Sequence, residues 1–318
     1  MHVRTLLQRL FVVSSLALAG CGEEASPAAA DGPFKAPTVA TVGGAFRSPY
    51  DAAPSPDGAT AYFVAEGGAR GPGLFRVAAR GGDATEIHTG APFAAPRGLA
   101  VSSDGQRVVV ADRTAGTGGG LYVVTVAGGA PTLLAGTEGT APRGLEIVAQ
   151  SGADVVYFTG ATREGAPAVY RVPLAGGALQ VVAMGAPLRN PSSVAVTAAG
   201  VVYVSDRVDD TTGLGAVYRI EGSAVTPLVN NVRLGNPAGI TLAPGDGILG
   251  VSSHDAQGRC QVLLVDLSTG ATSVYNQVIS ANRAAGGVHR AHGGTSTDLA
   301  WADLGGGLRG TVYRIQFN

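Results

Sequence analysis

The pentapeptide "APRGL" occupies residues 95–99 and returns unchanged at residues 141–145. Shorter versions of the same pattern restart after each of five prolines: Pro49, Pro96, Pro142, Pro191 and Pro237. The repeat is therefore about 47 residues long, and self-similarity at such a period is typical of proteins that stack one structural unit many times.

Each repeat contains four stretches of strand length. The unit that starts at Pro96 opens with the apolar run "GLAV" (98–101), turns at "SSDG", and continues in the β-branched run "RVVVAD" (107–112). A Gly-rich loop then leads to "GLYVVTV" (120–126) and to "PTLLAG" (131–136). The Asp-Gly pair favours a tight hairpin, so the runs are expected to pair as antiparallel strands.

A sixth unit matches only at its end, in "DLAWAD" (298–303) and "TVYRIQF" (311–317). Six units predict an all-β, six-bladed β-propeller with four antiparallel strands in each blade, spanning residues 37–318. No stretch has the period of an amphipathic helix, which argues against a helical solenoid. The pieces "P-x-G-L-A-V" and "SPDG" (55–58) resemble those of NHL and TolB-like repeats. This resemblance implies an architecture and leaves the function open.

The last unit stops after a third strand, "TVYRIQF" (311–317), so its fourth strand has to come from elsewhere. The stretch "TVATV" (38–42) precedes the first unit and has the composition of a fourth strand. We expect this N-terminal strand to pair with residues 311–317 and to close the last blade, because closure removes two open sheet edges.

Residues 1–20 read as a secretory signal, with Arg4 and Arg9 before a short apolar run. The run ends in Leu-Ala-Gly-Cys (18–21), which resembles the lipobox of bacterial lipoproteins. That resemblance implies cleavage before Cys21 and acylation of this cysteine, and two acyl chains anchor a protein stably. An ordinary signal peptide with an incidental cysteine is the alternative.

Residues 21–36 are rich in Ala and Pro and are expected to form a flexible tether. By the same resemblance, Gly22 is not the aspartate that retains lipoproteins at the inner membrane, so an exported protein anchored in the outer membrane is favoured. Cys260 is the only other cysteine. With Cys21 lipidated no internal disulfide can form, and Cys260 is expected to be a small buried hydrophobic residue.

The bulk composition excludes two classes of protein. Hydrophobic residues make up 45% of the chain and charged residues only 14%, which is too apolar for intrinsic disorder. Basic and acidic residues nearly cancel, 22 against 23, so no global field attracts nucleic acid. Partners are therefore expected to be the membrane, through the lipid, and a protein or an anionic glycan.

The arginines gather on one expected face. In a propeller the connectors into each inner strand, and the loops between second and third strands, lie on one side, here called the mouth face. Arg97 and Arg143 follow the connector proline directly and should line the channel mouth. The expected ligand-binding set is Tyr50, Arg97, Arg113, Arg143, Arg189 and Arg207.

Guanidinium groups match carboxylate, phosphate or sulfate in two parallel bonds, which favours an anionic ligand. The same expected face also has acidic residues: Glu66, Asp112, Glu164, Asp206, Asp209, Asp210 and Asp303. The simpler alternative is therefore a solvated face on which the arginines form surface ion pairs with these acids.

Blade six departs from the pattern. Aligned through Asp303, it places Arg290 and His292 where blade two has Leu99 and Val101. At the mouth position of Arg97 the remaining blades would then have Tyr50, Ser192, Ala238 and Val288. Buried polar groups need partners, so we expect a hydrogen-bonded plug here, or else a shifted alignment.

No cofactor is expected, with a divalent metal as the alternative. His254, His289 and His292 are candidate ligands, although strand residues three apart point to opposite faces. The acidic loop "DRVDDTTG" (206–213) could hold Ca²⁺ but is more typical of a solvated loop. No G-x-S-x-G, Walker or dinucleotide motif appears in a matching context.

These features favour a non-enzymatic binding or scaffold protein, anchored by lipid in the cell envelope. The alternative is a metal-dependent hydrolase or lactonase, since six-bladed propellers of the gluconolactonase/regucalcin family are similar. That family holds its metal at the channel mouth with Glu, Asn and Asp. This chain has Tyr50, Arg97, Arg143, Ser192 and Ala238 there, while the following residues lie nearby but out of register: Asp51, Glu146, Asn190, Asn236 and Asp298.

Overall fold

The computed structural model divides the chain into Met1–Lys35 and Ala36–Asn318, and everything described below belongs to the second unit. The described residues are 38–208, 212–275, 285–304 and 310–316. The predicted signal peptide, the tether and Cys21 lie outside them. Within these ranges the structure holds strands β1 to β23 and no helix, hence no helix that could cross a membrane.

Consecutive strands pair antiparallel in four-stranded blades. Blade one comprises the second half of β1 (Thr38–Pro54), β2 (Thr60–Gly68), β3 (Gly71–Ala78) and β4 (Thr85–Thr89). Blade two comprises β5 (Pro96–Val101), β6 (Arg107–Asp112), β7 (Gly120–Thr125) and β8 (Thr132–Leu133). Blade three comprises β9 (Leu145–Gln150), β10 (Ala153–Ala161), β11 (Pro167–Pro173) and β12 (Gln180–Met184).

The second half of the ring repeats this arrangement. Blade four comprises β13 (Pro191–Val196), β14 (Val202–Asp206), β15 (Leu214–Glu221) and β16 (Ala224–Arg233). Blade five comprises β17 (Ile240–Leu242), β18 (Ile248–His254), β19 (Cys260–Asp266) and β20 (Thr272–Tyr275). Blade six comprises β21 (Ala285–Arg290), β22 (Asp298–Asp303), β23 (Gly310–Gln316) and the first half of β1.

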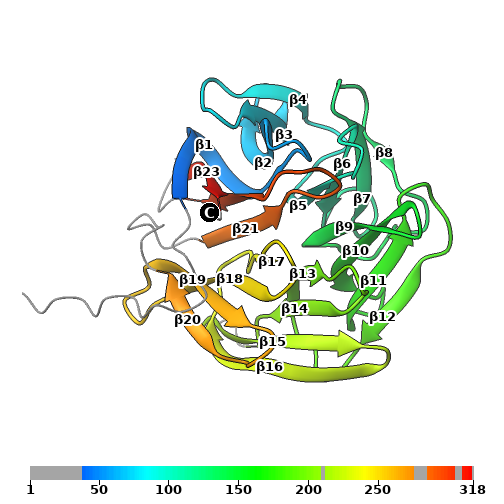
Figure 1. The fold of residues 1–318 in the computed structure, drawn as a ribbon. Helices are drawn as coiled ribbons and strands as arrows, with labels where there is room; N and C mark the ends of the chain where they lie inside the picture. The colour runs from blue at the N-terminus through cyan, green and yellow to red at the C-terminus, as the bar shows by residue number, and fades with distance from the viewer. Residues whose placement is uncertain (1–37, 209–211, 276–284, 305–309, 317–318) are drawn as a thin grey trace, which may run out of the picture. The chain divides into compact units, whose positions relative to one another are not determined.

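The inner strands close into a ring. Around the axis in Figure 1, β1, β5, β9, β13, β17 and β21 each contact the next, and β21 returns to β1. The unit is therefore a six-bladed β-propeller, as the repeat predicts.

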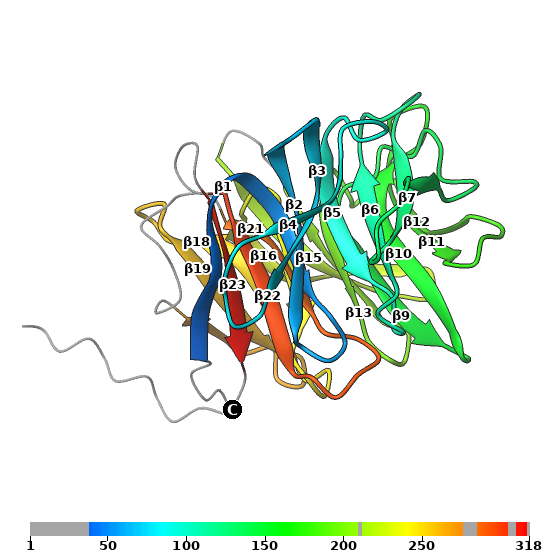
Figure 2. The same cartoon turned by 90° about the horizontal axis from the view of Figure 1, so that it is seen from above.

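Strand β1 belongs to two blades. Its first half pairs with β23, with Thr38 opposite Gln316 and Thr41 opposite Tyr313. Its second half pairs with β2, with Pro54 opposite Ala61. Figure 2 shows β1 (blue) beside β23 (red), so the predicted closure of blade six by the N-terminal strand is confirmed.

Within the described residues the core consists of six apolar clusters, one between each pair of neighbouring blades. In β6, Val108 and Val110 pack toward blade one while Val109 packs toward blade three. Both faces of a blade are thus buried, which explains why these strands are continuous apolar runs rather than alternating ones. Cys260 is buried between blades five and six, as expected from the sequence.

The Asp-Gly turns form as predicted at the end of the blades opposite the mouth face. In the first one, Gly58 N donates to Ser55 O, and the Asp57 carboxylate accepts from the Ser55 hydroxyl at 2.6 Å. Gly58 has a φ of +70°, in the left-handed region that glycine adopts without strain.

The predicted alignment of blade six is wrong by two residues. Val288 pairs with Trp301, which is the pairing that Leu99 makes with Val110 in blade two. Gly286, not Val288, therefore occupies the mouth position of Arg97. The turn between the first two strands is two residues longer in blade six: Arg290 lies opposite Leu299, whereas Val101 lies opposite Val108 in blade two.

Candidate functional site

The repeated Pro-Arg-Gly-Leu has a physical reason at each position. The leucines are fully buried between blades. The glycines lie where inner strands of adjacent blades approach most closely: a Cβ on Gly98 would collide with the carbonyl oxygen of Arg143, and one on Gly144 with that of Ser192. The arginine between proline and glycine is left at the rim, where its side chain faces the channel mouth.

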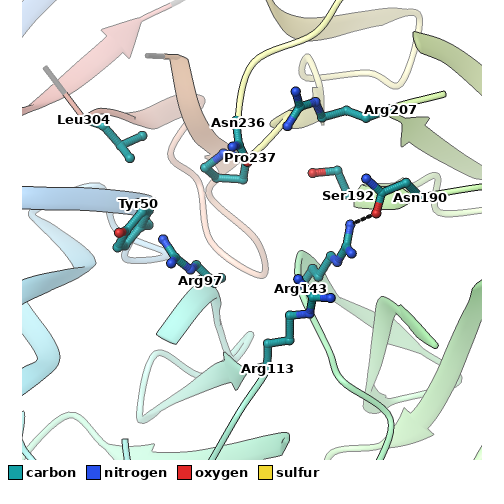
Figure 3. Close-up of a pocket in the computed structure, with 10 residues that line it drawn as sticks. All are labelled: Tyr50, Arg97, Arg113, Arg143, Asn190, Ser192, Arg207, Asn236, Pro237 and Leu304. Carbon is teal, nitrogen blue, oxygen red and sulfur yellow. Dashed lines mark hydrogen bonds between the residues drawn. The ribbon is translucent and has the colours of Figure 1, made fainter. Parts of the chain in front are cut away.

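A pocket of about 720 Å³ opens at this mouth and is here called the mouth pocket. Figure 3 shows its lining side chains converging from several blades. They are Tyr50, Arg97, Arg113, Arg143, Asn190, Ser192, Arg207, Asn236, Pro237 and Leu304. Four of them are arginines, and no carboxylate of the described residues belongs to the lining.

Arg97 is held by an aromatic ring rather than by an acid. Its guanidinium carbon lies 3.7 Å from the centroid of the Tyr50 ring, a cation–π contact. The Tyr50 hydroxyl donates to Glu66 at 2.7 Å, and Glu66 also lies 3.8 Å from Arg47. Burial and the bond to Glu66 raise the pKa of Tyr50 although Arg97 opposes the change, so the phenol stays neutral.

None of the ion pairs between described residues includes Arg97. Arg97 therefore lines the mouth pocket without an ion-pair partner among the described residues. Arg143 donates to the side-chain oxygen of Asn190, as the dashed line in Figure 3 marks.

The buried acids Asp112 and Asp206 of this face accept hydrogen bonds from backbone N–H groups rather than from arginine side chains. Asp206 accepts from the backbone N of Arg189 and of Asn190 at 2.8 and 2.7 Å. Burial raises the pKa of Asp206, opposed by these two bonds and by the charges of Arg143 and Arg189.

Asp112 has the same role in blade two. One carboxylate oxygen accepts from the backbone N of Ala94 and Ala95, and the other from Thr114 and Ala115. Neither Asp112 nor Asp206 forms an ion pair within the described residues. The surface pairing considered as an alternative does occur at one place on this face, where the exposed Arg47 lies 3.8 Å from Glu66.

A second pocket of about 260 Å³, here called the side pocket, adjoins the first between blades three and four. It shares Arg113, Arg143 and Asn190 with the mouth pocket and adds Arg189. Together the two pockets contain all six residues expected from the sequence to bind a ligand. The sequence placed Asn190 and Asn236 near the mouth but out of register, and the structure places both in the lining, each directly before a connector proline.

A buried polar cluster, here called the polar plug, links the inner strands. His289 Nε2 lies 2.9 Å from Asp51 Oδ2, and both side chains are almost fully buried. Asp51 also accepts from the backbone N of Ala52 and Leu99. Burial alone would lower the pKa of His289, but the charge of Asp51, its hydrogen bond and the charge of Glu146 raise it.

The plug extends to the far end of the channel. Glu146 Oε1 lies 2.8 Å from His292 Nε2 without an aligned hydrogen bond between them, and the Glu146 carboxylate accepts from Val196 N. Arg290 donates to Asp246 and, at 3.1 Å, to the carbonyl of Val196. The expected plug is present, and Arg290 belongs to it rather than to the mouth face.

The three candidate metal ligands do not come together. His289 and His292 are engaged by Asp51 and Glu146, and His254 lies apart at the edge of blade five beside Arg233 and Gln261. Within the part of the chain that the structure describes, no group of three His, Cys, Asp or Glu side chains is placed to hold a metal ion. Residues 209–211 of the acidic loop considered for Ca²⁺ lie outside that part.

Comparison with known proteins places the chain in the class of β-propellers. No family model and no curated protein matches it. Among solved structures, it is similar to a gluconolactonase from Xanthomonas campestris, at 18% identity and a TM-score of 0.58, over 90% of this chain and 96% of the other.

Two further structures show the same fold. TolB from Acinetobacter baumannii matches at 14% identity and a TM-score of 0.57, over 74% of this chain and 56% of TolB. A chain of a nidogen/laminin complex matches at 15% identity and a TM-score of 0.57, over 72% of this chain and 80% of the other. At these identities the likeness concerns the fold, which binding proteins and a lactonase share.

Proposed function

We propose that this propeller is a non-enzymatic binding protein that holds an anionic protein or glycan at the mouth pocket. The observation that carries the proposal is the convergence of Arg97, Arg113, Arg143 and Arg207 on one pocket whose described lining has no carboxylate. A concave site lined by charges of one sign concentrates field and attracts ions of the other sign.

The arginines are also positioned in advance. Arg97 rests on the Tyr50 ring, and Arg143 is bonded to Asn190. Side chains that are already ordered lose less conformational entropy when a ligand arrives, which favours binding. The whole chain has a net charge of only −1, so the gathering of guanidinium groups is a property of this pocket and not of the protein as a whole.

The lactonase alternative has less support because the acids near the mouth are used elsewhere. Asp51 and Glu146 belong to the polar plug, and Asp298 lies 2.8 Å from Arg314. Asn190 and Asn236 remain in the lining, but amide oxygens without a carboxylate are a poor donor set for a divalent metal. Guanidinium groups in the same pocket would repel the ion.

The test is binding of acidic peptides and of envelope polysaccharides to the wild type and to Arg97→Ala/Arg143→Ala. We expect affinity that falls with added salt in the wild type and is lost in the double variant, while the melting temperature is kept. Arg80→Ala, which removes an exposed arginine at the opposite end of blade one, is the matched control. Equal affinity of the double variant and the wild type would refute the proposal.

We also propose that the propeller is an exported lipoprotein of the cell envelope, anchored through Cys21 and favouring the outer membrane. The Leu-Ala-Gly-Cys sequence at 18–21 supports this. Cys21→Ser should release soluble protein that lacks the mass of the acyl chains. A variant that stays in the membrane fraction at unchanged mass would contradict the anchor.

A further inference from the structure

We propose that the mouth pocket is one half of a two-part site for an extended anionic polysaccharide, whose other half is the side pocket at Arg189. This inference rests on the proposed function and specifies its ligand. It means that the ligand runs from the channel mouth outward between blades three and four, and that it carries several anionic groups along one chain.

The continuity of the two pockets is the first observation. Arg113, Arg143 and Asn190 line both, so their side chains face two spaces at once. Arg97 belongs only to the mouth pocket, and Arg189 only to the side pocket. A ligand with one anionic group can satisfy one end, whereas a chain with repeated anionic groups reaches both.

The second observation is that blade three lacks an acid that blades two and four have. Asp112 and Asp206 end the second strand of their blades and cap the connector beside it. The corresponding residue of blade three is Gly160, and a Cβ there would collide with the carbonyl of Thr140, which instead accepts from Ala161 N at 2.8 Å. A backbone bond thus replaces the carboxylate.

The charge of the side pocket follows from this replacement. Its described lining contains three arginines and no carboxylate. Asp206 is buried beneath its connector. Glu164 is fully exposed on the adjoining loop, where its own backbone N–H and the Thr162 hydroxyl lower its pKa, and it is not part of the lining. Arg189 is exposed and forms no ion pair within the described residues.

The balance of donors and acceptors favours a glycan over an acidic peptide. Guanidinium groups donate only, and the Asn190 side-chain oxygen already accepts from Arg143. A peptide would bring one N–H per residue that needs an acceptor, and the lining side chains with an acceptor oxygen are Tyr50, Thr162, Asn190, Ser192 and Asn236. A polysaccharide with carboxylate or sulfate groups brings mainly acceptors, and its hydroxyls serve as either. The Tyr50 ring is covered by Arg97, so recognition relies on charge rather than on ring stacking.

The experiment is calorimetric titration of two size series at low salt, from mono- to hexasaccharide: oligogalacturonates and sulfated heparin fragments. A polyglutamate of matched charge is titrated beside them. The proteins are the full chain and its Arg97→Gln, Arg189→Gln and Arg80→Gln variants, the last being the charge-matched control.

We expect affinity to rise with chain length in at least one series, because the second contact is made at high effective concentration. Arg189→Gln should lower hexasaccharide affinity about tenfold, as for the loss of a charge-assisted hydrogen bond, and leave the shortest fragment unchanged. Arg97→Gln should weaken every length, and Arg80→Gln none.

Affinity that is independent of length and of Arg189 would overturn the two-part site while leaving the proposed function in place. Tighter binding of polyglutamate than of every saccharide would overturn the glycan. The absence of salt-dependent binding to any probe would overturn the proposed function itself.

Discussion

Neighbouring residues of the repeated motif have different roles: the glycine permits close contact between blades, and the arginine beside it faces the mouth pocket. Gly98 permits the backbone of blade two to approach Arg143, and Arg97 then projects beside the same contact. The glycine therefore sets where the arginines lie. The mouth position was predictable because Arg97 and Arg143 occupy the same place in two consecutive repeats.

Replacement of Gly98 should show how strongly the protein depends on this close contact between blades two and three. Gly98→Ala is expected to destabilise the protein by about 1–3 kcal/mol, as for overpacking of a filled site, since its Cβ meets backbone rather than a flexible side chain. Chemical denaturation measures the loss. Gly247→Ala is the control, because a Cβ there meets nothing within 4 Å; equal effects of the two changes would refute the argument.

The contribution of His289 to stability is expected to depend on pH. Burial lowers the pKa of His289, but the charge and hydrogen bond of Asp51 together with the charge of Glu146 raise it in the folded protein above its ordinary value of 6.5. The protonated ring therefore contributes stability that is fully present below about pH 6.5 and is lost as the pH rises through the folded-state pKa.

Thermal unfolding of His289→Gln across pH tests this. The difference in melting temperature from the wild type should be largest in mild acid and should shrink toward alkaline pH. In an Asp51→Asn background the same histidine change should lose that dependence on pH. A difference that grows with rising pH would show that the sign is wrong.

Among the elements, β1 matters most because one strand completes two blades. Its N-terminal half was recognisable in the sequence as a fourth strand without a blade, and its partner was the one unit that lacked such a strand. The part of blade six that could not be foreseen is β21. Its position along β22 follows from the longer turn between these two strands. Gly286 and Gly287 then lie so close to blade one that a Cβ would clash with the carbonyl of Tyr50 and the side chain of Asp51.

Removal of the closing strand should be costly. Deletion of residues 37–43 takes away the partner of β23 and the buried Val42, exposing a sheet edge and part of the core between blades six and one. We expect a loss of several kcal/mol in the free energy of unfolding, measured in denaturant. Deletion of residues 22–28, equally long but within the expected tether, should change little; an unchanged stability of the first variant would contradict the closure argument.

At the scale of the whole propeller unit, each blade is buried on both faces, so no blade can open without exposing two cores. Trp301, the only tryptophan, is fully buried in blade six and reports on the closure. Its fluorescence transition in denaturant is expected to coincide with the loss of β-structure by circular dichroism. In the variant that lacks residues 37–43 the fluorescence transition should come first, and separate transitions in the wild type would argue against cooperative closure.

The sequence by itself determined the number of blades, the strands within each one, the closing strand and the placement of Arg97 and Arg143 at one mouth. These follow from the repeat because hairpins, turn residues and strand periodicity act over short separations along the chain. The tertiary structure alone decided the register of blade six and the side pocket beside Gly160. It alone showed that Asp112 and Asp206 accept hydrogen bonds from the backbone of the connectors. It also decided the pairing of His289 with Asp51, which are 238 residues apart. Contacts between blades and across the channel depend on how the ring closes. Closure brings together residues that lie far apart in the sequence, and no local pattern indicates which of them will meet.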